Sequence, residues 1–126
     1  MRVVNSRVTI NNRTIRRLER ASITALEKTL VAMRTDITQA QVTPFDTGAT
    51  QGWDTYEDFS QSRQGEVKLV TSNPYVRRIY FHPEYHFHKT HNAHAQGKWY
   101  QPWITGVKKN FCKNAFTRFY RQEALR

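Results

Sequence analysis

Cysteine is nearly absent from this sequence, since Cys112 is the only one among its 126 residues. A lone cysteine excludes an intrachain disulfide, and it excludes a zinc site built from several thiolates. The sequence also lacks an apolar run of the roughly 18 residues that a membrane-spanning helix needs, a secretory signal pattern and a glycine-rich phosphate loop. We therefore expect a protein made in the cytosol, without a membrane contact and without a nucleotide cofactor.

Acidic residues are scarce relative to basic ones. The chain carries 20 Lys and Arg against 10 Asp and Glu, which gives a net charge of +10 with neutral histidines. Such an excess favours a polyanionic partner or an acidic protein surface. The basic residues are spread from Arg2 to Arg126 in short clusters, so no single recognition helix stands out. A small basic nucleic-acid-binding protein is one functional hypothesis, and residues 1–126 are expected to form one domain.

Two segments show the spacing of amphipathic helices. From Asn12 onward apolar side chains recur every three or four residues, and neither glycine nor proline interrupts the segment before Pro44. This pattern predicts one long helix, capped by Asn11 or Asn12, with its apolar stripe in the core. After Pro102 a second stripe predicts a C-terminal helix. Its apolar members are Val107, Phe111, Cys112, Ala115, Phe116, Phe119 and Tyr120.

The middle of the chain is rich in aromatic and β-branched residues. Residues 53–59 and 66–71 predict the two strands of a β-hairpin, joined by the polar segment 60–65. Val8 and Ile10 alternate with polar residues, which predicts a further short strand within residues 2–10. Together these elements predict an α+β fold in which a long N-terminal helix and a C-terminal helix pack on a small antiparallel sheet.

Prolines mark the connections between these elements. Residues 44–48 predict a structural turn, formed by Pro44, Asp46, Thr47 and Gly48, in which the Asp46 carboxylate accepts backbone hydrogen bonds. Pro74 suits the first position of a short helix that continues through Tyr80. Residues 83–97 are rich in His and Asn and show no clear period, so we expect a long surface loop there.

The triplet Asp46-Thr47-Gly48 also matches the active-site turn of retroviral-type aspartic proteases, in which two subunits each supply one carboxylate. In those enzymes the turn connects apolar strands of an all-β chain, whereas here it follows a predicted long helix and Pro44. No glycine-rich flap is found. We therefore favour a structural turn and expect neither catalytic residues nor an enzymatic activity.

Five histidines gather in and beside the predicted loop, namely His82, His86, His88, His91 and His94. Closely spaced imidazoles can bind a transition metal, but this spacing matches neither a His-Glu-x-x-His site nor a zinc finger. The pair His91-Asn92 with His94 also lacks the hairpin and helix of a histidine-based nuclease. We therefore expect no metal and no cofactor, and we assign the histidines to hydrogen bonds, aromatic stacking or subunit contacts. Cys112 is expected to be a small buried side chain and not a nucleophile.

The order of the motifs resembles a known family. After the predicted long helix come residues 42–50 (VTPFDTGAT), and after the hairpin come residues 71–80 (TSNPYVRRIY), 82–85 (HPEY) and 97–104 (GKWYQPWI). This order resembles the minor capsid proteins of siphophages and prophages, the neck or tail-completion family. The resemblance covers most of residues 12–120, and it departs from the family at Thr50, where relatives often carry an aliphatic residue.

The resemblance implies a non-enzymatic subunit of a homo-oligomeric ring in the head-to-tail connector of the virion. The implied neighbours are portal/adaptor or head-closure proteins and tail-terminator or tail-tube proteins. Packaged double-stranded DNA would pass through the ring and touch it without reading bases. The candidate interface or DNA-channel residues are Arg77, Arg78, His86, His88, Lys108 and Lys109.

Overall fold

The architecture consists of a long helix, a β-hairpin and three further helices. A computed structural model describes residues 4–43, 55–72, 76–85, 87, 89 and 92–126. In chain order the elements are α1 (Asn12–Ala40), β1 (Thr55–Asp58), the 3-10 helix η1 (Ser62–Gln64), β2 (Lys68–Thr71), α2 (Val76–Tyr80), α3 (Gln101–Ile104) and α4 (Phe111–Ala124).

The long helix α1 begins and ends with specific caps. The Asn11 Oδ1 atom accepts a hydrogen bond from the Thr14 backbone N–H at 3.1 Å, which satisfies one of the free donors of the first turn. At the other end Gln41 adopts a left-handed conformation (φ 56°), and its N–H donates to the Thr38 carbonyl. The predicted long helix and its Asn11 cap are confirmed.

The hairpin is the only sheet in the described part of the chain. Strands β1 and β2 pair antiparallel, with Thr55 opposite Thr71 and Asp58 opposite Lys68. The connection contains η1, which ends at Gly65 with a φ of 85°, a value that glycine adopts without steric cost. The predicted hairpin is confirmed within these bounds.

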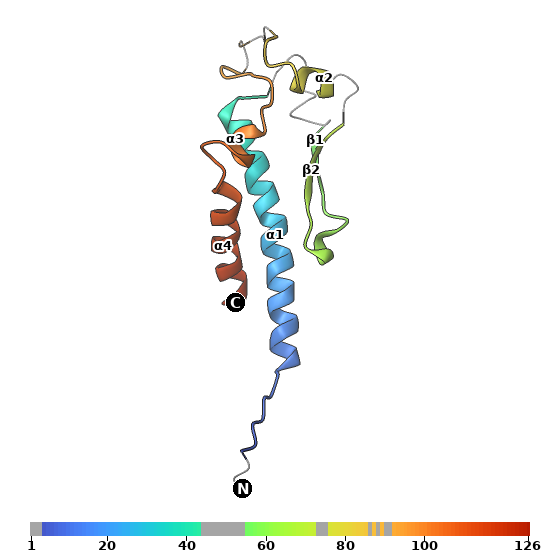
Figure 1. Cartoon of the computed structure of the whole chain (residues 1–126), viewed down its shortest axis with the longest axis vertical. Helices are drawn as coiled ribbons and strands as arrows, with labels where there is room; N and C mark the ends of the chain where they lie inside the picture. Colours follow the sequence, from blue (N-terminus) through green and yellow to red (C-terminus); the bar gives the residue numbers. More distant parts are fainter. Residues whose placement is uncertain (1–3, 44–54, 73–75, 86, 88, 90–91) are drawn as a thin grey trace.

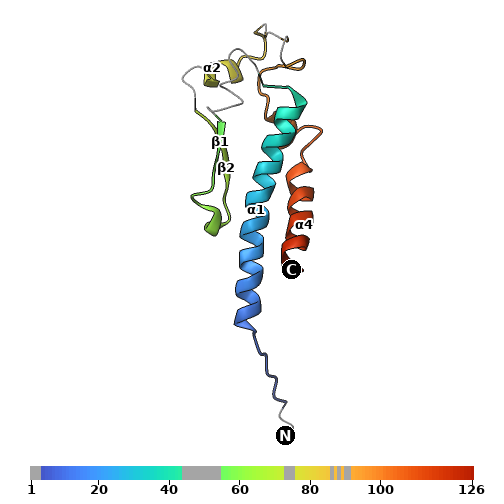
Figure 2. The same ribbon diagram turned by 180° about the vertical axis from the view of Figure 1, so that it is seen from behind.

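Three elements lie side by side in one layer. In Figures 1 and 2, which view the molecule from opposite sides, α1 runs between the hairpin and α4. Helix α4 is antiparallel to α1 and packs along it, while η1 and β2 contact the other side of α1. The expected α+β class is confirmed, and α1 is the element on which both of the others pack.

The main apolar cluster lies at the C-terminal end of α1. Trp99 is completely buried there, and Tyr80 meets it edge-on with ring centroids 4.8 Å apart. Helices α2 and α3 each contribute one buried residue to the cluster, so these short helices close the end of the molecule. The buried members are Ile37, Val42, Val76, Trp99 and Trp103.

Two sequence-based assignments are wrong. Residues 4–10 form no strand, and Val8 and Ile10 remain 84% and 63% exposed, because no neighbouring strand completes a ladder with them. Val107 is 96% exposed and lies before α4, since a turn over residues 107–110 delays the start of that helix to Phe111. The remainder of the predicted apolar stripe does lie in α4.

The segment 83–97 contains no helix or strand among its described residues. Its second half also contacts the end of α1. The Asn92 Nδ2 atom donates to the Thr43 carbonyl at 2.7 Å, and Asn92 and Ala95 are buried. Backbone N–H groups of His94 and Gln96 donate to the carbonyls of residues 41 and 42.

Candidate functional site

The predicted basic interface residues do not form one patch. Arg77 and Arg78 are exposed on α2, whereas Lys109 is exposed in the turn before α4. These two segments lie on opposite sides of α1 (Figures 1 and 2). Lys108, the fourth residue of this group, is half-buried and has partners within the chain.

Lys108 belongs to a small network on α1. Its Nζ atom lies 2.9 Å from Asp36 Oδ2, and the same oxygen accepts a hydrogen bond from Trp103 Nε1 at 2.8 Å. The ammonium also lies 5.1 Å from the centroid of the Trp103 ring. Lys108 therefore holds the turn before α4 onto α1, and it is a poor candidate for a partner contact.

Arg78 takes part in an exposed aromatic network. Its Nε atom donates to the Tyr85 hydroxyl at 3.4 Å, and the Tyr85 ring stacks on His82 with centroids 4.7 Å apart. His82 Nδ1 lies 2.6 Å from Glu84 Oε1, and this hydrogen bond lowers the pKa of Glu84. Phe81 beside this network is exposed. Exposed aromatic rings with an arginine are typical of protein interfaces.

The remaining sequence-predicted site residues, Pro44, Asp46, Thr47, Gly48, His86 and His88, lie outside the described residues. Their assignments stay predictions. In the part of the chain that the structure describes, no three His, Cys, Asp or Glu side chains converge as metal ligands. Cys112 is half-buried with its Sγ atom 3.5 Å from Met33 Sδ, and burial raises the pKa of its thiol. This shift favours the protonated thiol over the more reactive thiolate.

The candidate interface residues chosen from the sequence leave out a further concentration of basic charge. Five exposed arginines lie between Asn12 and Arg20 of α1 and in the segment before it, and we call them the basic end: Arg7, Arg13, Arg16, Arg17 and Arg20. None of the ion pairs between described residues involves them. The first turn of α1 has no acidic residue. Because the N-terminus of a helix is itself partly positive, these cations raise the local potential further.

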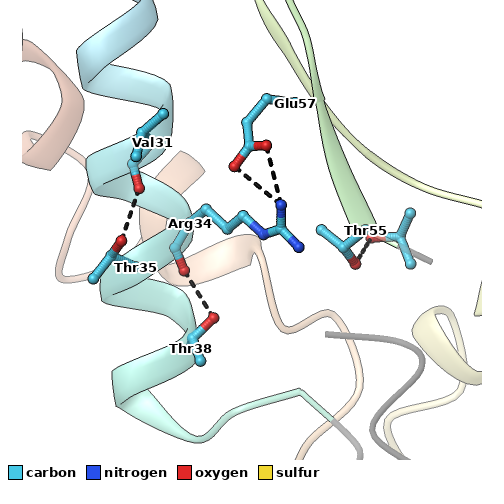
Figure 3. Close-up of polar contacts among 7 residues, drawn as sticks. Val31, Arg34, Thr35, Thr38, Thr55 and Glu57 are labelled. Atoms are coloured by element: carbon cyan, nitrogen blue, oxygen red, sulfur yellow. Dashed lines mark hydrogen bonds and ion pairs between the residues drawn. The ribbon is translucent and has the colours of Figure 1, made fainter. Parts of the chain in front are cut away.

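An ion pair fixes the hairpin against α1. Arg34 Nη1 donates to both carboxylate oxygens of Glu57, at 3.1 and 3.0 Å (Figure 3). The Thr55 and Thr71 hydroxyls share a further hydrogen bond across the two strands. The hairpin is thus held at a fixed place beside α1, and this places Phe59, just beyond β1, near the middle of that helix.

Phe59 forms one wall of an open groove on α1. Phe119 of α4 forms the opposite wall, and the space between them is about 430 Å³. Val31 on the floor is 48% exposed. We call this the lateral groove; it is lined by Thr24, Glu27, Lys28, Val31, Ala32, Phe59 and Phe119.

No helix within the described residues has both the length and the hydropathy to cross a membrane. A scan against protein-family models found no match, and searches of curated proteins and of solved structures found no similar chain.

Proposed function

We propose that the protein is a structural subunit of the neck, the head-to-tail connector of a tailed bacteriophage. It forms a homo-oligomeric ring between portal/adaptor or head-closure proteins and tail-terminator or tail-tube proteins, in the virion, around the channel for the DNA. The observation that carries the proposal is the order of the motifs in residues 42–50, 71–80, 82–85 and 97–104. The protein has no catalytic role in this proposal.

The amount of exposed surface supports a function within an assembly. The accessible surface is 9551 Å² for a mass of 14.9 kDa. A compact monomer of this mass exposes roughly 7,000 Å², so the chain exposes about a third more. A single layer of elements leaves two faces of α1 without a covering element (Figures 1 and 2). Subunits whose apolar faces are completed by neighbours have this property.

The proposal is tested by deleting the gene from the phage or prophage that encodes the protein. Lysates of the deletion should contain DNA-filled heads and free tails that do not join, as seen by electron microscopy. Supplying the intact gene from a plasmid should restore infectious particles. Normal yields of infectious, tailed particles from the deletion would refute the proposal.

The basic end supports a second candidate, a small nucleic-acid-binding protein. Five exposed arginines without an ion-pair partner among the described residues can contact phosphates without reading bases. Such a protein binds any duplex, and its affinity falls steeply with salt. Absence of duplex binding at low salt would remove this candidate.

A further inference from the structure

The segment before α1 carries apolar side chains that remain largely exposed. Val4, Val8 and Ile10 are 80%, 84% and 63% exposed, and residues 4–11 run away from the rest of the molecule (Figure 1). We call residues 4–11 the arm. In an extended chain, side chains alternate between two sides, so these three even-numbered residues share one side of the arm. The arm thus presents an apolar edge that only another surface can cover.

The lateral groove is an apolar surface that can cover this edge of the arm. Its walls are aromatic, its floor includes the half-exposed Val31, and Thr24, Glu27 and Lys28 are its polar members. The Lys28 ammonium is already paired with Glu123 of α4. Glu27 has no ion pair with another described residue. Arg7 lies on the other side of the arm from Val4, Val8 and Ile10, so the contact between the arm and the groove is apolar.

Distance decides whether the arm can fill the groove of its own chain. Thr24, the groove residue nearest to the start of α1, lies roughly 18 Å along the helix from Asn12, at 1.5 Å per residue. Val8 is joined to Asn12 by a stretch of chain that spans at most about 14 Å, and Ile10 by about 7 Å. Neither side chain reaches its own groove, whereas Val4, joined to Asn12 by a stretch that spans up to about 28 Å, does reach it. The three apolar residues can therefore dock together only in the groove of a second copy.

We propose that the arm of one copy binds in the lateral groove of a second copy. The arm and the groove are different surfaces of the subunit, so the contact is head-to-tail and each copy offers both halves of it. Repetition of such a contact closes into a ring when the rotation allows it. The inference rests on the self-assembly that the proposed neck function requires, and it names the surfaces that perform it.

Self-association of purified variants tests the apolar contact. The full chain carrying Val8→Asp and Ile10→Asp should self-associate at least about tenfold more weakly than the wild type, because two buried aliphatic side chains are lost. The measurement is sedimentation equilibrium over a range of concentrations. The matched control carries Asn5→Asp and Thr9→Asp, which add the same charge on the other side of the arm. Equal weakening of self-association by both variants would mean that added charge alone causes it, and this would overturn the proposal. Unchanged self-association of the Val8→Asp and Ile10→Asp variant would overturn it as well.

Cross-linking tests which surfaces meet. In a Cys112→Ser background, copies with Val8→Cys are mixed with copies with Val31→Cys and treated with a short bismaleimide. A link between positions 8 and 31 of different chains, identified by mass spectrometry, should form on the order of tenfold faster than a link between positions 8 and 107 in a Val107→Cys control, because docking raises the local concentration. Equal rates, or no link, would overturn the proposal. So would an 8–31 link that forms only within one chain carrying both substitutions.

The two proposals fail in different ways. If rings form without the 8–31 link, the arm contact is wrong and the neck assignment stands. If the link forms but the deletion phage still yields normal tailed particles, the arm contact stands and the neck assignment is wrong.

Discussion

At the scale of single residues, Asp36 is the point where α1, α3 and the turn before α4 meet. One carboxylate oxygen accepts from both Trp103 Nε1 and Lys108 Nζ. Trp103 is buried in the main cluster, so its indole N–H depends on this acceptor, whereas the Lys108 ammonium remains partly in water. The two bonds therefore differ in their contribution to stability, although their lengths are nearly equal.

Replacement of Asp36 should separate the two contributions. Asp36→Ala leaves the Trp103 indole without its acceptor, and we expect the free energy of unfolding to fall by roughly 1–3 kcal/mol. Lys108→Gln removes only a partly exposed ion pair and should cost at most about 1 kcal/mol. Urea unfolding followed by tryptophan fluorescence measures both. Asp36→Ala removes both bonds, so losses of equal size for the two variants would show that the ion pair, and not the indole hydrogen bond, dominates.

At the scale of elements, periodicity predicts what is local and self-contained. The apolar residues that recur every three or four positions in α1 and from Phe111 to Tyr120 correctly predict two helices with a buried apolar face. Such a prediction succeeds because a helix makes its backbone hydrogen bonds within its own segment. A strand needs a partner, so the same reasoning failed at Val8 and Ile10, where the alternation is present and the second strand is not. The hairpin was predictable because its partner strand follows directly in sequence.

The contact between α1 and α4 depends on small side chains. Ala115 is buried on α4, and α1 buries Ala21 and Ala25 along its own side. Ala115→Leu should lower the free energy of unfolding by about 1–3 kcal/mol, because the larger side chain must push the helices apart. Thermal unfolding by circular dichroism measures the change. Lys113→Leu, on the exposed side of the same helix, is the control and should leave stability nearly unchanged; equal losses in both would contradict a tight contact at Ala115.

The end of α4 is held to α1 by charge. Glu123 accepts a hydrogen bond from Lys28 Nζ and lies beside Arg126, and the bond from Lys28 holds the pKa of Glu123 below its ordinary value. A carboxylate whose pKa is lower in the folded state stabilises the fold above its unfolded pKa, and this contribution is lost as the pH falls through the folded value. Glu123→Gln should therefore lower the melting temperature at pH 7, and the difference from wild type should shrink below about pH 4.

Melting curves at several pH values test this dependence on Glu123. Glu66→Gln is the control, since Glu66 is exposed and lies 3.6 Å from Lys68 within the hairpin. A melting-temperature difference for Glu123→Gln that stays constant from pH 7 to pH 3 would mean that its cause is packing and not the ionised carboxylate.

At the scale of the whole molecule, the location of charge could not be predicted from the sequence. Three basic pairs stand out in the chain, namely Arg16-Arg17, Arg77-Arg78 and Lys108-Lys109. Lys108 is bound to Asp36, however, and the last two pairs lie apart. The basic end combines the arm with one side of α1. Its exposure depends on where α4 and the hairpin stop along α1, because the first turns of the helix project beyond both (Figure 1). Only tertiary packing fixes that position.

The basic end gives the last prediction, which concerns binding to duplex DNA of arbitrary sequence. If its arginines contact phosphates, replacing Arg13, Arg16, Arg17 and Arg20 by Gln should reduce the slope of log affinity against log salt by about 3–4 units, at roughly 0.9 per lost phosphate contact. Fluorescence anisotropy with a labelled duplex at a series of salt concentrations measures the slope. The control replaces Arg77, Arg78, Lys98 and Lys109 by Gln, which removes the same charge from the other end of the molecule. A similar drop in slope for both variants would assign the binding to net charge alone, whereas a drop confined to the control would place the DNA contact at Arg77, Arg78, Lys98 and Lys109.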